Sequence, residues 1–124
     1  MTGDIDHGSL RVLFTARPPG VRCEGDIDLC TRDVLSRALN MALERGTGDL
    51  HADLRGVGFV DVGGLRVLVE TAFGMSGGRR LVVEGLSPHT RRIVELCGWT
   101  GILLVRPENL SSGGITTNCS SVVP

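Results

Sequence analysis

The segment Phe59–Leu68 combines residue types that suit the binding of another molecule's charged or polar group. An apolar run leads into Asp61, the pair Gly63-Gly64 follows, and a second apolar run begins at Leu65. This order predicts a strand, a tight turn and a helix. A carboxylate and unpaired backbone N–H groups would then lie together at the helix N-terminus, which carries partial positive charge. Such a position favours an anion, a phosphorylated hydroxyl or an acidic group of a partner.

Two further carboxylates, Asp26 and Asp28, could bind a metal or act as a general acid and base. No histidine or third carboxylate stands at ligand spacing from them, so an acidic docking edge is the favoured interpretation. The histidines are isolated from one another: His7, His51 and His89. The sequence contains no Ser/His/Asp or Cys/His arrangement. We therefore expect no catalytic residues, no metal, no cofactor and no enzymatic activity.

The pair Gly63-Gly64 could instead belong to a phosphate-binding loop. A P-loop requires a Lys-Ser/Thr pair after its glycines, and here Leu65 and Arg66 follow. Nucleotide binding is therefore disfavoured. A tight turn between strand and helix accounts for both glycines, and Asp61 would cap the helix whether or not it also contacts a partner.

The composition indicates a single soluble domain. The chain has 124 residues, of which 41% are hydrophobic and 22% charged, and its net charge is −1. Nothing in this balance favours nucleic acid as a partner, because no basic stripe with interleaved aromatic residues is present. No apolar run reaches the length of a membrane span, and the acidic N-terminus lacks the apolar core of a signal peptide. We expect a cytoplasmic protein without membrane insertion, with four cysteines that are reduced and mostly packed rather than joined in disulfides.

Hydrophobic periodicity predicts an α/β fold with a mostly parallel central sheet, an N-terminal hairpin and three or more helices. The predicted strands are Leu10–Thr15, Val21–Gly25, Leu50–Val60, Leu81–Glu84 and Ile102–Val105. The predicted helices begin after Thr31, Asp61 and Ser87, each a capping residue, and end before Gly46, Gly77 and Gly98. We expect Asp26–Leu29 to be an acidic connection, residues 1–9 to be a flexible N-terminus, residues 10–106 to form the domain and residues 107–124 to be a disordered tail.

The apolar positions within the helices predict which side chains face the sheet. Helix stripes are expected over Val34–Leu43 in the first helix and over Leu65–Phe73 in the second. In the third helix the expected stripe consists of Ile93, Val94, Leu96 and Cys97, and Trp99 is expected to pack against the core.

Taken in order, several motifs of the chain resemble STAS domains, and specifically bacterial anti-sigma factor antagonists. The matching segments are Gly25–Asp28, Asp53–Leu65, Gly85–Pro88 and Arg91–Gly98. Each motif is weak alone, while their combination in order and spacing is fairly specific. The resemblance covers residues 10–106.

The resemblance implies a partner switch. Such antagonists bind an anti-sigma factor, often a serine kinase, and so free a sigma factor; phosphorylation of a Ser or Thr before the motif glycine ends the interaction. Here Gly63 occupies the hydroxyl position and Gly64 the motif glycine. Asp61 matches the aspartate before the phosphorylated residue, and Asp26 and Asp28 match the family's acidic connection. Since Gly63 has no hydroxyl, the usual switch by phosphate is absent at this position.

The resemblance also implies the contact surface. The expected partner-binding residues are Asp26, Asp28, Asp61, Val62, Gly63, Gly64, Leu65 and Arg66. Val62, Leu65 and Arg66 would supply an apolar patch and a polar rim, as interfaces require.

Two alternatives come from other functional classes. STAS domains also serve as subunits of membrane transport assemblies, and a helix N-terminus could sense a nucleotide or another anion. A homodimer stays open as well. With Gly63 in place of the hydroxyl residue, a constitutive antagonist and a decoy are both compatible with the sequence.

Overall fold

The computed structural model describes residues 4–106, and these form a mixed β-sheet with helices packed on it. The strands are β1 (Asp4–His7), β2 (Leu10–Ala16), β3 (Pro19–Ile27), β4 (Leu50–Val60), β5 (Leu81–Glu84) and β6 (Leu104–Val105). They lie side by side in the order of the sequence, antiparallel from β1 to β3 and parallel from β3 to β6. The predicted α/β class with an N-terminal hairpin and a mostly parallel sheet is confirmed.

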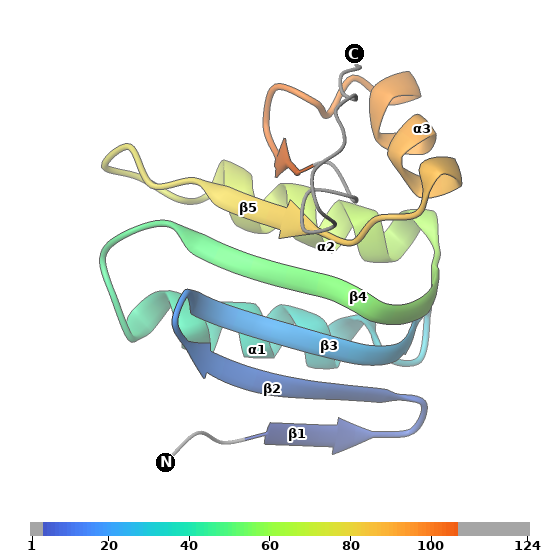
Figure 1. The fold of residues 1–124 in the computed structure, drawn as a ribbon, viewed down its shortest axis with the longest axis horizontal. Helices are drawn as coiled ribbons and strands as arrows, with labels where there is room; N and C mark the ends of the chain where they lie inside the picture. Colours follow the sequence, from blue (N-terminus) through green and yellow to red (C-terminus); the bar gives the residue numbers. More distant parts are fainter. Residues whose placement is uncertain (1–3, 107–124) are drawn as a thin grey trace, which may run out of the picture.

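The helices are α1 (Arg32–Glu44), α2 (Val62–Phe73) and α3 (Pro88–Leu96). Helices α1 and α2 pack against one face of the sheet and against each other. Helix α3 lies past β5, at the end of the sheet away from β1 (Figure 1). The core between them consists of the inward side chains of β2 to β5 and the apolar stripes of α1 and α2. This layering brings the C-terminal ends of the parallel strands β3 and β4 to one edge of the sheet.

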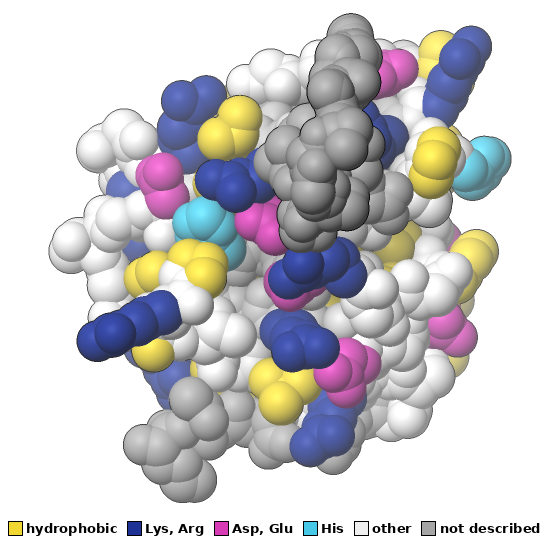
Figure 2. Space-filling model, viewed as in Figure 1, with side chains coloured by type: hydrophobic (Ala, Val, Ile, Leu, Met, Phe, Trp, Pro, Cys, Tyr) yellow, Lys and Arg dark blue, Asp and Glu magenta, His cyan; other side chains and the backbone are white. Residues whose placement is uncertain are grey.

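The opposite face of the sheet carries polar side chains. In β4, His51, Asp53 and Arg55 alternate with the buried residues Leu50, Ala52 and Leu54. Figure 2 looks onto this face and shows basic and acidic side chains interspersed over it. Asp53 and Arg55 form a close pair at 2.9 Å, and hydrogen bonding from Arg55 lowers the pKa of the Asp53 carboxyl. Period-two alternation therefore directs charge to one face and the core to the other.

Two differences from the predicted boundaries lie near the N-terminus. Strand β1 falls within residues 1–9, for which a flexible segment was expected, and it pairs antiparallel with β2. This pairing is made by backbone N–H and C=O groups, which every residue type carries. The side-chain pattern of the sequence therefore does not reveal β1. Asp26 and Ile27 belong to β3 rather than to a connection, because Ile27 is fully buried and Asp26 pairs with Phe59 of β4. The expected disordered tail, residues 107–124, lies outside the described residues.

The apolar stripes of α1 and α2 are largely as expected, whereas three side chains were wrongly placed. Phe73 is 79% exposed, because it lies in the last turn of α2, about 80° around the helix from Leu65. Leu96 is 75% exposed, because it lies about 200° from the buried Val94. Cys97 follows the last residue of α3 and is exposed. Trp99 packs against the core as predicted.

Candidate functional site

Asp61 joins the end of β4 to the start of α2 and holds the turn in place. Its backbone is extended, and its Oδ1 accepts the N–H of Gly64 at 2.7 Å, which is the predicted N-cap. Its own N–H donates to the carbonyl of Ile27 at the end of β3, at 3.0 Å. The start of α2 is therefore fixed to the C-terminal edge of the sheet.

Gly64 is required by packing. A Cβ atom at this position would collide with Cγ2 of Ile27, a fully buried side chain, and would lie 3.4 Å from Cγ1 of Val60. Neither neighbour is the free end of a flexible chain. The second glycine of the pair is therefore explained by the close approach of α2 to β3 and β4.

Gly63 has a different environment. A Cβ atom there would lie 2.6 Å from Nη1 of Arg32 and would collide with Cζ and Nη2 of the same guanidinium. Arg32 is the first residue of α1, and its Nη2 lies 3.5 Å from Oδ2 of Asp61. Arg32 is not among the residues expected from the sequence. No local signal marks it, because its position depends on how α1 and α2 pack side by side.

The β3–α1 connection is held by an internal hydrogen-bond network. Asp28 Oδ1 accepts the backbone N–H groups of Cys30 at 2.9 Å and Thr31 at 3.2 Å. The Thr31 hydroxyl donates to the Asp26 carbonyl at 2.9 Å and accepts the N–H of Asp28 at 2.9 Å. Thr31 therefore does not cap α1 through its side chain, as the sequence had suggested, but ties the start of α1 back to β3. The Asp28 carboxylate stabilises this turn, whereas Asp26 contributes its backbone carbonyl to the network.

The expected contact residues differ in their access to solvent. Leu65 is fully buried and Gly64 is buried, so neither offers a side chain to a partner and both act as support. Val62 is 52% exposed and Arg66 is exposed, while Asp61 and Gly63 are partly exposed.

Two exposed apolar side chains outside the expected set of contact residues lie at the same sheet edge. Phe59, near the end of β4, is 54% exposed, and Leu29, in the β3–α1 connection, is 73% exposed. The parallel pairing of β3 with β4 brings these two segments to one edge. We call the exposed and partly exposed residues at this edge the α2 corner, and it comprises Asp26, Leu29, Arg32, Phe59, Asp61, Val62, Gly63 and Arg66. Large apolar side chains exposed together in this way are typical of interaction surfaces.

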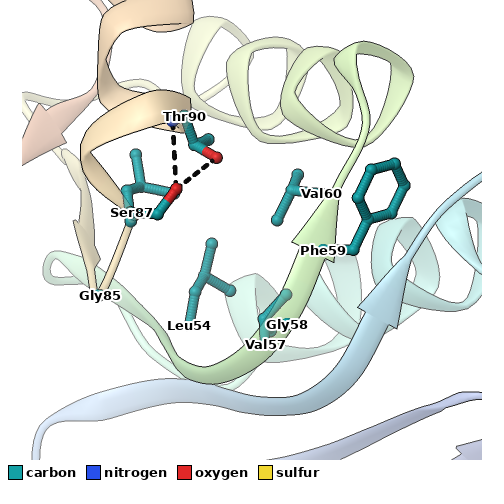
Figure 3. A pocket seen from close by; sticks show the side chains of 9 residues that line it. Leu54, Val57, Gly58, Phe59, Val60, Gly85, Ser87 and Thr90 are labelled. Atoms are coloured by element: carbon teal, nitrogen blue, oxygen red, sulfur yellow. Dashed lines mark hydrogen bonds between the residues drawn. The ribbon is translucent and has the colours of Figure 1, made fainter.

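A small recess lies beside the α2 corner, between β4 and the start of α3 (Figure 3). It is lined by Leu54, Val57, Gly58, Phe59, Val60, Gly85, Leu86, Ser87 and Thr90. Ser87 Oγ accepts the backbone N–H of Thr90 at 3.2 Å, so that the predicted cap of α3 borders the recess. Its volume of about 30 Å³ has room for roughly one water molecule. Pockets for ligands the size of a nucleotide are about ten times larger.

In residues 4–106, no group of three or more His, Cys, Asp or Glu side chains is arranged to hold a metal ion. Burial raises the pKa of the Cys23 thiol to about 12. Cys23, Cys30 and Cys97 are free thiols, and Cys119 lies outside the described part of the chain. No helix within that part combines the length and apolarity needed to cross a bilayer.

Comparison with known proteins agrees with the resemblance seen in the sequence. A family model described as "Mlab, STAS domain" matches residues 3–106. The crystal structure of an anti-sigma factor antagonist from Mycobacterium paratuberculosis is similar, with a TM-score of 0.65 and 25% sequence identity. The match covers 86% of this chain and 85% of that one. No curated protein sequence matches the chain.

Proposed function

Since this chain belongs to the STAS domain family, we propose that it is an anti-sigma factor antagonist, which binds an anti-sigma factor and thereby releases a sigma factor. The observation that carries the proposal is the exposure of the α2 corner. The start of α2 lies at the surface, and this edge of the sheet carries exposed apolar side chains that a partner could bury: Leu29, Phe59 and Val62. The protein would act by binding, in the cytoplasm, and not by catalysis.

The corner has the composition of a protein interface. Its apolar side chains can be buried at the centre of a contact, and Asp26 and Arg66 can form a polar rim. Leu65 and Gly64 support it from beneath, because Leu65 is fully buried and Gly64 packs against Ile27. A partner would therefore meet a rigid surface and would order few side chains on binding.

Phosphorylation of position 63 would not control this antagonist. The partner is expected to be an anti-sigma factor of the serine-kinase type, and Gly63 offers that kinase no hydroxyl. The antagonist would then bind whenever both proteins are present, and its activity would be set by its amount.

A second candidate is a STAS subunit of a membrane transport assembly. The description of the matched family model, "Mlab, STAS domain", names no sigma regulator, so the family match is compatible with this role. The same exposed corner would serve for docking. Recovery of the natural partner distinguishes the two candidates. Nucleotide sensing is less favoured, because the recess beside the corner has a volume of about 30 Å³, too small for a nucleotide.

The test is a pull-down from the native cytoplasm with two matched variants at opposite ends of α2. Val62→Arg alters the corner, and Phe73→Arg alters an even more exposed apolar side chain about 16 Å away along the helix. The wild-type protein and Phe73→Arg should recover an anti-sigma factor, whereas Val62→Arg should lose it. Recovery of transport subunits would instead support the second candidate. Equal recovery by both variants would exclude the corner as the contact surface.

A further inference from the structure

The Arg32 guanidinium fills the volume that a side chain at position 63 would occupy. The Cβ site of Gly63 lies 2.6 Å from Nη1 of Arg32, and real Cβ atoms essentially never approach a heavy atom within 3.0 Å. Arg32 in this arrangement and a side chain at position 63 therefore exclude each other. The glycine that removes the hydroxyl also makes room for the arginine.

Asp61 holds the guanidinium at this place. Its Oδ2 lies 3.5 Å from Nη2 of Arg32, while its Oδ1 accepts the Gly64 N–H. Both side chains reach the surface, with 34% of Arg32 and 27% of Asp61 exposed. The α2 corner thus presents a positioned cation next to Gly63.

Arg32 has more donors than its neighbours satisfy. A guanidinium carries five N–H groups, and Asp61 is the one acidic side chain paired with it within residues 4–106. Its Nε is buried and has no hydrogen-bond partner among those residues. An acidic side chain of a partner could use the outward donors in the bidentate geometry that arginine favours.

We propose that Arg32 is the specificity-determining residue of the α2 corner: its guanidinium replaces the missing side chain of Gly63 and binds a carboxylate of the anti-sigma factor. This inference rests on the proposed function. The charge is permanent, since arginine stays protonated in proteins. A phosphorylated hydroxyl at the same place would instead bring about two negative charges. The sign of the charge at this position is therefore opposite to that of a phosphorylated relative, and a serine kinase cannot change it.

The experiment measures affinity for the anti-sigma factor that the wild-type protein recovers, purified and titrated by calorimetry. Arg32→Ala should raise Kd by about ten-fold or more, as expected for loss of a charge-assisted hydrogen bond. Arg32→Lys should retain part of the affinity. The matched control is Arg37→Ala, which removes an exposed arginine from the same helix and should leave Kd within about two-fold. Increasing salt should weaken binding of the wild type more steeply than binding of Arg32→Ala.

A second measurement needs no partner. In an amide NMR spectrum, Arg32→Ala should shift the Gly63 signal and leave those of Gly77 and Gly78, beyond the far end of α2, unchanged. An unshifted Gly63 signal would show that the guanidinium does not lie over this residue. If the wild type and Arg32→Ala bind the anti-sigma factor equally, the proposed role of Arg32 is wrong while the proposed function stands. If the wild type recovers no anti-sigma factor, the proposed function fails, and the role of Arg32 in it fails with it.

Discussion

Replacing each glycine of the Gly63-Gly64 pair by alanine should have different effects on stability, although the two residues are adjacent in one helix. In Gly64→Ala the new methyl group meets Ile27, which is fully buried and cannot move away. Overpacking of this kind costs about 1–3 kcal/mol. The better helix propensity of alanine returns about 0.5–1 kcal/mol. The expected net loss in the free energy of unfolding therefore lies between about 0 and 2.5 kcal/mol, with a central value of about 1 kcal/mol.

In Gly63→Ala the new methyl group meets the end of the Arg32 side chain, which is flexible and partly exposed. Displacing it breaks the Arg32–Asp61 pair, and such partly exposed pairs contribute at most about 1 kcal/mol. The gain in helix propensity is of similar size. The free energy of unfolding should therefore stay within about 0.5 kcal/mol of the wild-type value, which is roughly the sum of these two terms.

Urea unfolding followed by far-UV circular dichroism and by the fluorescence of Trp99, the single tryptophan, would measure both variants. The difference between them should be about 1 kcal/mol, or about 3–6 °C in Tm for a domain of this size. Equal stability of the two variants would refute the packing described for the start of α2. A larger loss for Gly63→Ala than for Gly64→Ala would refute it more strongly, because it would place position 63 against the core.

Three further predictions concern single side chains. Asp61→Ala removes the cap of α2 and should lower the free energy of unfolding by about 0.5–2 kcal/mol in chemical denaturation; an unchanged value would mean that Asp61 does not cap the helix. Cys23 is buried and its pKa is raised to about 12, so it should resist alkylation by iodoacetamide at pH 8 while the exposed Cys30 reacts. Peptide mass spectrometry would measure both reactions, and labelling of native Cys23 at the rate of Cys30 would contradict this prediction. Asp53 has a lowered pKa in the folded state, so its contribution should be present above about pH 4 and lost as the pH falls through the lower folded value. Asp53→Asn should thus cost less than about 1 kcal/mol at pH 7, since the Arg55 side chain is 60% exposed, and progressively less as the pH falls below about 4; a cost that does not change with pH would argue against the ion pair.

The fold could be predicted from the sequence because the apolar pattern and the capping residues agree. Period-two strands and helical stripes gave the order of the elements, and Asp61 and Ser87 cap their helices as expected. Strand β1 could not be predicted in this way, because it is formed by backbone pairing along the edge of β2. Phe73 and Leu96 were misplaced because an apolar residue near a helix end does not show by its type which side it faces.

The candidate site could be predicted only in part. The contiguous segment around Asp61 was found because strand, cap and glycines follow one another in the chain. Arg32 was missed, since it comes from another helix and its contact with Gly63 arises only when α1 packs beside α2. Asp28 was assigned to the contact surface, and the hydrogen bonds it accepts from Cys30 and Thr31 give it a structural role that spacing alone does not reveal. Both cases depend on tertiary contacts between segments.

The central claim is that an anti-sigma factor docks on the exposed start of α2. Amide hydrogen exchange of the full chain, with and without the purified anti-sigma factor, tests it most directly. We predict slower exchange on binding in residues 59–66 and unchanged exchange in the α2–β5 turn around residues 77–78, beyond the other end of the helix. Protection in the turn with none in residues 59–66 would contradict the claim.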